Sequence, residues 1–410
     1  MMSLMTWIDE RFPASQLWRE HISEYYAPKN FNFWYYFGSL AMLVLVNQLL
    51  TGIWLTMFYT PSAAEAFASV EYIMRDVEWG WLIRYMHSTG ASFFFIVVYL
   101  HMMRALLYGS YQKPRELIWI FGCLIFLVLM AEAFMGYVLP WGNMSYWGAQ
   151  VIISLFGAIP VIGDTLVTWV KGDFVLGDAT LNRFFALHVV ALPIVLLGLV
   201  VAHIMALHHV GSNNPDGVDI KKNKDANGIP KDGIPFHPYY TVKDLFGVGV
   251  FLILFAGVIF FVPTFGGLFL EPPNFTPADP LATPDHIAPV WYFTPFYSIL
   301  RAITFDMLWV PAKLWGVILM FGAVGILFFL PWLDRSPVRS IRYKGWLYKA
   351  ILAVFVASFL LLGYLGTQPP GDWRGPAALI GTIIYFAFFL LMPIYSRFDK
   401  TKPVPERVTK

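Results

Sequence analysis

Long apolar runs alternate with shorter polar stretches along the whole chain. A helix needs about 20 apolar residues to cross a hydrocarbon core of roughly 30 Å. Runs of that length lie near residues 33–58, 82–106, 117–138, 184–208, 245–263, 312–331, 346–366 and 377–395. The pattern therefore predicts an all-α integral membrane protein with eight transmembrane helices. An even number of spans places both termini on the same side.

Composition and charge support this prediction and orient the chain. The 410 residues are 58% hydrophobic and 13% charged, with a mean hydropathy of +0.60, which excludes an ordinary water-soluble domain. Lys and Arg gather in alternate loops, above all between Lys221 and Lys243 and in residues 335–349 and 397–410. The positive-inside rule then places both termini in the cytoplasm. The first thirty residues show no pattern of a removable signal peptide.

The polar stretches divide the spans into two groups. Residues 1–210 are expected to form a four-helix unit and residues 245–410 a second one, with 211–244 as a cytoplasmic connection rich in Lys, Pro and Gly. The loops 139–182 and 264–311 fall on the periplasmic side. They are long and apolar enough to form short helices at the membrane surface, and loops of that length are usually functional.

Four of the nine histidines stand inside two of the predicted spans. Such residues are costly in a membrane and are functional candidates. His87 and His101 are fourteen residues apart, which brings both to one helix face about 21 Å apart. His188 and His203 are fifteen apart, an excess rotation of roughly 60° that a bend at Pro193 can absorb. Two spans with the same direction then present two histidine pairs, and each pair can supply both axial ligands of a haem.

The alternative for any one of these histidines is a hydrogen-bonded interior residue, but four in matched register favour ligands. The single cysteine, Cys123, excludes an internal disulfide and a four-thiolate cluster, and the chain lacks the CxxCH motif of covalent haem. Any metal must therefore use histidine, and the predicted cofactors are two non-covalent b-type haems.

Glycines share the spacing of the histidines. Gly38 and Gly52 on the first span are fourteen residues apart, as are Gly122 and Gly136 on the third. A macrocycle between helices needs positions where the backbone comes close without a Cβ atom. Small residues in membrane helices also serve helix packing alone, but their register with the histidines favours a haem site.

Two arginines lie one helical turn from the predicted ligands, toward opposite membrane surfaces. Arg84 is three residues before His87, and Arg104 is three residues after His101. Haem propionates are natural partners for these guanidinium groups. Each arginine taken alone also fits a side chain that extends to the membrane surface.

At this point the sequence closely resembles cytochrome b of the quinol–cytochrome c reductase (cytochrome bc) complexes, of bacterial respiratory type. The resemblance runs from about Trp34 to Tyr395. Its most specific stretches are MGYVLPWGNMSYWGA (135–149), RFFALH (183–188), HHVGSNNPDG (208–217), HPYYTVKDLFG (237–247) and PVWYF (289–293).

The resemblance implies the two haem sites and their ligands. His87 and His188 would bind the low-potential haem near the periplasm, and His101 and His203 the high-potential haem near the cytoplasm. The residues implied to contact the cofactors are Gly38, Gly52, Arg84, Arg104, Trp119, Gly122 and Gly136.

The resemblance also implies two quinone sites, with ubiquinone as the expected quinone. Quinol oxidation, with loop 264–311, would use Phe134, Tyr137, Gly148, Pro289, Trp291, Tyr292 and Tyr297. Quinone reduction would use Ser39, His208, Ser212, Lys243 and Asp244.

The implied reaction couples electron transfer to proton translocation. One quinol electron would pass to a Rieske-type iron–sulfur protein and a c-type cytochrome, and the other through the two haems to the second quinone site. A homodimer of the complex and membrane lipids are further expected partners, and no nucleic acid is expected.

Two features depart from the family pattern. The family signature PEWY reads Pro289-Val290-Trp291-Tyr292 here, so its carboxylate is missing, while Glu132 stands where the family usually has Thr. We hypothesise that Glu132 replaces the missing proton acceptor. The alternative is that Glu132 is only hydrogen-bonded to neighbouring helices and has no proton role. Asp279 and Asp285 are weaker candidates for the proton acceptor. The fifteen-residue histidine interval, fourteen in most respiratory members, leaves the ligands unchanged.

Two other functions compete with this interpretation. A di-haem b-type membrane anchor of a dehydrogenase or hydrogenase also stacks bis-histidine haems, but such anchors usually have four or five spans and need no second helical unit. A secondary transporter would show broken-helix repeats in its two halves, and the sequence shows no such repeat.

Overall fold

The computed structural model describes residues 3–409, and most of them are helical. Within this range, seven helical stretches are long and apolar enough to cross a membrane. They contain α3 (Tyr36–Thr56), α5 (Gly80–Tyr108), α6 (Glu116–Val138), α9 (Asp178–Ala186) with α10 (Leu192–Val210), α11 (Thr241–Phe261), α13 (Ala312–Gly325) with α14 (Leu330–Leu333), and α15 (Trp346–Thr367). These match the first seven predicted spans.

The eighth predicted span is bent rather than straight. It consists of α16 (Arg374–Leu390) and α17 (Met392–Phe398), whose axes differ by 61°. Pro393, at the start of α17, has no backbone N–H, and its ring excludes a continuous helix through the preceding turn. The apolar run at 377–395 is therefore a broken span, and the count of eight holds only when this pair is taken as one.

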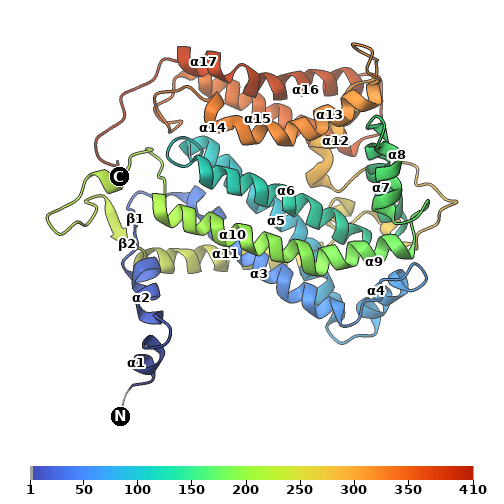
Figure 1. Cartoon of the computed structure of the whole chain (residues 1–410), viewed down its shortest axis with the longest axis horizontal. Coiled ribbons are helices and arrows are strands. Elements are labelled where there is room, and N and C mark those ends of the chain that lie inside the picture. The colour runs from blue at the N-terminus through green and yellow to red at the C-terminus, as the bar shows by residue number, and fades with distance from the viewer. Residues whose placement is uncertain (1–2, 410) are drawn as a thin grey trace.

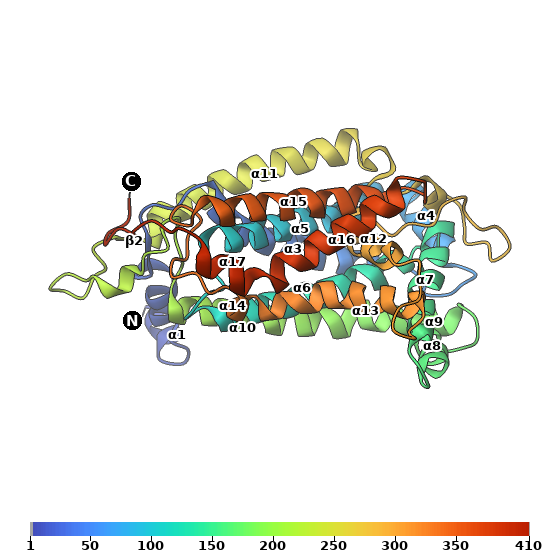
Figure 2. The same ribbon diagram turned by 90° about the horizontal axis from the view of Figure 1, so that it is seen from above.

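The long helices run side by side, and short elements gather at the two ends of the bundle (Figures 1 and 2). One end carries α4 (Ala66–Arg75), α7 (Asn143–Leu155), α8 (Gly163–Lys171) and α12 (Thr294–Ala302). The opposite end carries α1 (Leu4–Asp9), α2 (Ala14–Trp18) and the antiparallel pair of β1 (Tyr26–Pro28) and β2 (Gly233–Pro235). The predicted loops 139–182 and 264–311 thus lie at one end and contain short helices, as expected.

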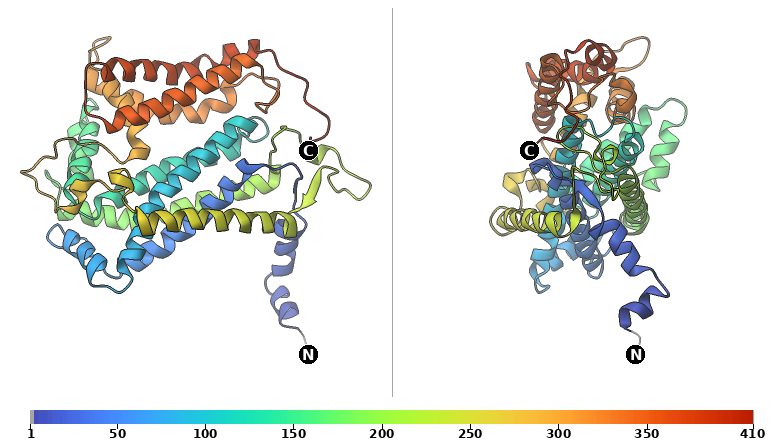
Figure 3. Two further views of the ribbon diagram at one scale, coloured as in Figure 1. Left: turned by 180° about the vertical axis from the view of Figure 1, so that it is seen from behind. Right: turned by 90° about the vertical axis from the view of Figure 1, so that its left-hand side faces the viewer.

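The helices pack in groups. α3 packs along α5, and α6 packs along α10, while α12, α13, α15 and α16 pack on one another. Seen along the bundle, this last group lies to one side of the other helices (Figure 3). α11 contacts α3 and α5, although it begins the predicted unit 245–410. The division into 1–210, 211–244 and 245–410 stays a prediction.

The turn that follows Pro289 is fixed between α5 on one side and α15 on the other. The Tyr292 ring stacks on Phe95 of α5 with centroids 3.9 Å apart, and the Tyr292 carbonyl accepts a hydrogen bond of 2.6 Å from Tyr99. On the other side, a Cβ atom at Gly366 of α15 would overlap the Thr294 carbonyl. Glycine is required there because the backbone of α12 lies directly against α15.

Asp232 links three distant segments at the β1–β2 end. Arg407 donates to both of its carboxylate oxygens at 2.6 and 2.8 Å, and Lys29 Nζ lies 3.0 Å from Oδ1. The hydrogen bonds from Arg407, with a further contribution from Lys29, lower the pKa of Asp232 to about 2 despite its burial. The N-terminal segment, the connection 211–244 and the C-terminal segment are therefore held together at one end of the bundle.

We expect Asp232→Asn to destabilise this end by about 2 kcal/mol at neutral pH, because it removes charge-assisted hydrogen bonds from a buried carboxylate. The folded-state pKa is depressed, so the stabilisation is present above the unfolded pKa of about 4 and is lost as the pH falls toward 2. The apparent unfolding temperature of the purified protein at a fixed scan rate measures the effect. Glu406→Gln, at an exposed neighbour of Arg407, is the matched control, and an equal loss in both variants would contradict the assignment.

Candidate functional site

The four histidines inside the spans form two pairs of facing rings. The ring centroids of His87 and His188 are 6.2 Å apart with planes crossing at 89°, and those of His101 and His203 are 6.3 Å apart with planes crossing at 68°. Metal–imidazole bonds of about 2 Å on opposite sides of one iron put the ring centroids roughly 6 Å apart. Both pairs therefore fit the axial ligands of a haem.

A local change of helix type absorbs the fifteen-residue interval between His188 and His203. Residues Leu187–Ala191 form a π-helical turn, η4, in which the N–H of Leu192 bonds to the carbonyl of Leu187. Pro193 follows directly and cannot donate to the carbonyl four residues before it. The wider turn takes up the extra residue, so the two histidines reach the same side despite the longer interval.

Hydrogen bonds fix which ring nitrogen faces a metal in the first pair. Thr51 donates its hydroxyl proton to the Asn47 carbonyl at 2.6 Å and lies 2.9 Å from His87 Nδ1, so His87 Nδ1 is the donor. His188 Nδ1 donates to the Glu132 carbonyl at 2.9 Å. Nε2 is therefore the nitrogen left for iron on both rings, which is the usual arrangement of a ligating histidine.

The four glycines in register each lie against one of these rings. A Cβ atom on Gly38, Gly52, Gly122 or Gly136 would meet the ring of His101, His87, His203 or His188, respectively. The distances to the ring carbon Cε1 are 3.4 Å at Gly38, 3.1 Å at Gly52 and 3.5 Å at Gly122, and at Gly136 the Cβ atom would overlap the ring. Glycine thus lets the helix backbone support the back of each imidazole.

Arg104 and Trp119 were both predicted to contact the cofactors, but they lie in different surroundings. Arg104 donates to the Asn213 carbonyl at 3.3 Å, and its Nε is buried without a hydrogen-bond partner among residues 3–409. An anionic carboxylate such as a haem propionate would satisfy this nitrogen. Trp119 instead donates its indole N–H to the Leu327 carbonyl at 2.7 Å, toward the C-terminal helices.

A cavity of about 510 Å³ opens at the end of the bundle that carries α7 and α12. This volume is typical of sites for small organic ligands. Of the residues predicted for quinol oxidation, Pro289 and Trp291 line it, together with Met144, Glu271 and His286. Trp291 is held by a hydrogen bond of 3.1 Å to Ser92 of α5.

The other residues predicted for quinol oxidation are held by contacts of their own and are not among those that line the cavity. Tyr137 donates a hydrogen bond of 2.9 Å to Glu271, and Gly148 lies against the Tyr137 ring. Tyr297 bonds to the Ile287 carbonyl at 3.2 Å. Phe134 packs against Phe184 with centroids 5.7 Å apart. The Tyr292 ring stacks on Phe95 of α5. Their role in quinol binding stays a prediction.

Glu132 lies beside His188 of the first histidine pair. Its Oε1 is 3.1 Å from His188 Nδ1, and its Oε2 is buried without a partner among the described residues. It is not among the residues that line the 510 Å³ cavity. Its part as proton acceptor for quinol stays a prediction.

Sequence reasoning missed Glu271 and Asn274. Asn274 donates to the Tyr137 hydroxyl at 2.9 Å and to Glu271 Oε2 at 3.3 Å. Burial raises the pKa of Glu271 to about 7, although hydrogen bonds from Tyr137 and Asn274 oppose the rise. The signal in the sequence was a carboxylate between an apolar run and two prolines, LFLEPPNF.

The residues predicted for quinone reduction fall into two groups at the β1–β2 end. Ser39 donates to Asp244 at 3.1 Å. The ring of His208 stacks on Tyr25, with centroids 4.7 Å apart, and the Tyr25 hydroxyl lies 2.8 Å from the Ser212 hydroxyl.

A row of aromatic rings joins the two groups. Neighbouring rings in the row Tyr25, Phe236, Tyr240 and Tyr35 have centroids 5.4 to 6.3 Å apart. The ammonium group of Lys243 lies over Tyr240, 5.1 Å from its centroid, rather than beside Asp244. Tyr25 and Tyr35 are additions that the sequence alone did not suggest.

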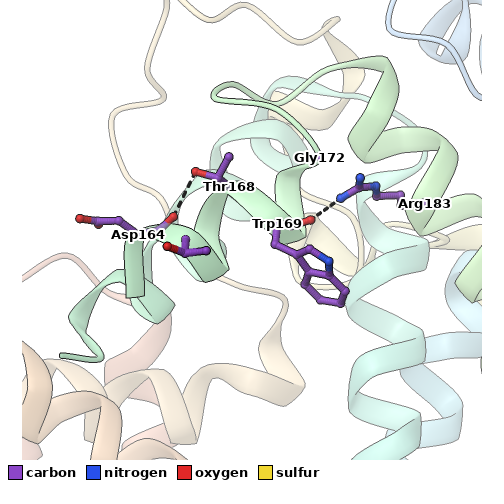
Figure 4. Close-up of a pocket in the computed structure, with 6 residues that line it drawn as sticks. Asp164, Thr168, Trp169, Gly172 and Arg183 are labelled. Carbon is purple, nitrogen blue, oxygen red and sulfur yellow. Dashed lines mark hydrogen bonds between the residues drawn. The ribbon is translucent and has the colours of Figure 1, made fainter. Parts of the chain in front are cut away.

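A separate hollow of about 540 Å³ lies between α8 and α9 (Figure 4). Arg183 donates to the Trp169 carbonyl, and Thr168 donates to the Asp164 carbonyl at 3.0 Å. None of the residues predicted for the haem or quinone sites lines it, and we assign it no role.

Comparison with known proteins covers nearly the whole chain. Residues 22–211 match the family described as Cytochrome b/b6/petB, and residues 277–388 match Cytochrome b(C-terminal)/b6/petD. The cytochrome b of Allochromatium vinosum is 65% identical over 99% of this chain and 98% of that protein. A Bradyrhizobium diazoefficiens protein named cytochrome b/c1 is 48% identical over 99% of this chain and 56% of its own length.

A solved structure titled "Hyperthermophilic respiratory Complex III" contains a similar chain. It aligns with a TM-score of 0.88 and 39% identity over 97% of this chain and 100% of that one. These matches do not favour a dehydrogenase or hydrogenase anchor. They show the membrane-spanning electron-transfer subunit of a multisubunit quinol–cytochrome c reductase, and they imply b-type haem. The chain therefore belongs to the cytochrome b family.

Proposed function

We propose that the chain binds two b-type haems, one between His87 and His188 and one between His101 and His203. The observation that carries this proposal is the pair of ring separations, 6.2 and 6.3 Å. Two haem irons, when bound, would supply two one-electron carriers spaced along the bundle. One quinol electron would cross the membrane through them.

The protein's own part is to orient all four ligand rings and, in the first pair, to fix the tautomer. Thr51 and the Glu132 carbonyl bind the Nδ1 atoms of the first pair, and the glycines keep the rings against the helix backbones. Arg84 and Arg104 would hold propionates toward the two membrane surfaces. A ring that is held in place would move little when an electron arrives or leaves. Each transfer then needs little rearrangement of the protein.

We place the cavity end in the periplasm and the β1–β2 end in the cytoplasm of a bacterial inner membrane. The lysines of the connection 211–244 lie at the β1–β2 end, as the positive-inside rule expects. α1 and the C-terminal segment lie at the same end (Figure 1). Both termini would then be cytoplasmic.

Quinol oxidation is assigned to the 510 Å³ cavity and quinone reduction to the opposite end. The cavity is lined by Pro289 and Trp291. At the other end, Asp244 with Ser39, and His208 with Ser212, place polar groups that can deliver protons to quinone oxygens. Ubiquinone is the proposed substrate. Opposite placement of the two reactions would couple electron transfer to proton translocation.

The proposed partners are a Rieske-type iron–sulfur protein and a c-type cytochrome, within a homodimer of the complex surrounded by lipid. The relative named cytochrome b/c1 supports the second partner, because this chain matches only 56% of its length. The cavity opens at the end where such electron acceptors would dock.

Single-ligand variants test the haem assignment. We expect two haems per chain in the purified wild-type complex, and a loss of at least one in His188→Leu and in His203→Leu, because an imidazole ligand is removed. Pyridine haemochrome spectra divided by protein concentration measure this ratio. His209→Leu, an exposed position on α10, should retain two. Full haem content in both ligand variants would contradict the proposal.

The glycine contacts make a separate prediction. Gly136→Ala places a methyl group into the His188 ring, so we expect reduced b-haem content or a shifted absorbance band for the first pair. Gly198→Ala on α10 is the matched control, because its Cβ atom would meet no atom within 4 Å. Reduced-minus-oxidised spectra of both variants decide the point. An unchanged spectrum in Gly136→Ala would refute the claim that glycine is needed to seat this ligand.

A further inference from the structure

We infer that Glu271 is the carboxylate that takes a proton from quinol in the 510 Å³ cavity. The inference deepens the proposed function and rests on quinol binding there. It assigns to Glu271 the part that the family gives to the second residue of PEWY, in place of Glu132, which we hypothesised from the sequence.

Position is the first argument. The residue at the family's carboxylate position is Val290, which is buried and has no side-chain acceptor. Glu271 lines the same cavity as Pro289 and Trp291 and directly precedes η8 (Pro272–Phe275). The cavity that lacks a carboxylate at one wall therefore has one at another.

The hydrogen bonds of Glu271 hold it as a base. Tyr137 and Asn274 both donate to its Oε2, at 2.9 and 3.3 Å, and Asn274 also donates to the Tyr137 hydroxyl at 2.9 Å. Two fixed donors orient the carboxyl group and favour its charged form, which is the form that accepts a proton. A group held in one place by neighbours from α6 and η8 is pre-arranged for proton transfer.

The surroundings leave Glu271 as the group whose charge changes near neutral pH. Burial raises its pKa to about 7, close to the value at which a general base is most effective. The neighbouring titratable groups are Tyr137 on α6, Tyr292 in the turn, and Asp285 and His286 at the cavity wall. Burial raises the pKa of Tyr292 and lowers that of His286, so both stay uncharged at neutral pH.

The proton transfer fits the known balance of the reaction. Quinol loses two electrons and two protons as it becomes quinone. One quinol O–H bond breaks as an O–H bond forms on the Glu271 carboxyl group, and the second proton leaves to water at the cavity mouth. The two electrons leave to the one-electron acceptors of the complex. Glu271 then releases its proton toward the mouth, where Asp285 is exposed.

Turnover of the purified complex as a function of pH tests the inference. We expect Glu271→Gln to lower quinol–cytochrome c turnover by at least about tenfold. We expect the wild-type rate to fall below about pH 7 as Glu271 becomes protonated, and this acid limb should disappear in the variant. Glu78→Gln, an exposed glutamate in the loop before α5, should leave rate and pH profile unchanged. An unchanged rate and acid limb in Glu271→Gln would overturn the inference.

Tyr137→Phe gives an independent readout that does not remove the carboxylate. Its hydroxyl stabilises the charged form of Glu271, so its loss should raise the Glu271 pKa and move the acid limb to higher pH. The b-haem spectrum of each variant verifies assembly. An acid limb that stays in place would contradict the inference even if Glu271→Gln fails to assemble. Loss of the limb in Glu132→Gln, with the limb kept in Glu271→Gln, would also overturn it.

A blocking variant separates this inference from the proposed function. Ala288 lines the cavity, and Ala288→Trp would place an indole ring in it and obstruct quinol binding without changing any charge. Unchanged turnover in Ala288→Trp would show that quinol is oxidised elsewhere and would remove both proposals. Blocked turnover in Ala288→Trp together with a normal Glu271→Gln enzyme would overturn the role of Glu271 alone.

Discussion

Two pairs of imidazole rings must be held about 6 Å apart inside an apolar interior where no water can replace a lost hydrogen bond. Much of the surrounding structure serves this requirement. Thr51 and the Glu132 carbonyl satisfy the outer nitrogens of the first pair. The π turn η4 corrects the phase of His188 relative to His203, and the four glycines let the rings lie close to the helix backbones. Each device is small, and each acts on the direction of an imidazole.

The same requirement explains why other polar chemistry lies at the two ends. The proposed quinol and quinone sites must reach an aqueous surface, because quinol and quinone exchange protons with water, whereas the histidine pairs need no such access. The cavity of Pro289 and Trp291 opens at one end, and Asp244 and His208 lie at the other. Aromatic stacking at Tyr292 and the close contact at Gly366 fix the cavity wall to rigid helices, which suits a site that must hold its reactants in a defined position.

The sequence was most informative where one physical rule decides the outcome. Span positions follow from the length of apolar runs, and the pairing of His87 with His188 follows from helical rotation on two parallel spans. The π turn at Leu187–Ala191 was not predicted, because a proline predicts a disturbance but not its type. The bend before Pro393 was missed because hydropathy alone does not register a break in the helix.

The candidate site residues that were missed are defined by contacts across the chain. The orientation of Glu271 depends on a hydrogen bond from Tyr137, which lies on a helix far away in sequence. Tyr25 precedes the first span in a polar segment and reaches His208 only through the fold. Neither periodicity nor local composition carries information on such contacts, which is why Glu132, visible as a charge inside a span, was the carboxylate that the sequence suggested.

A potentiometric titration of the b-haem absorbance of the complex tests the central claim most directly, because it asks whether the two histidine pairs hold two distinct redox centres. The account predicts two resolved one-electron transitions, of which the higher one shifts when a ligand occupies the quinone-reduction site near His208. A single transition, or no b-haem signal, would contradict it.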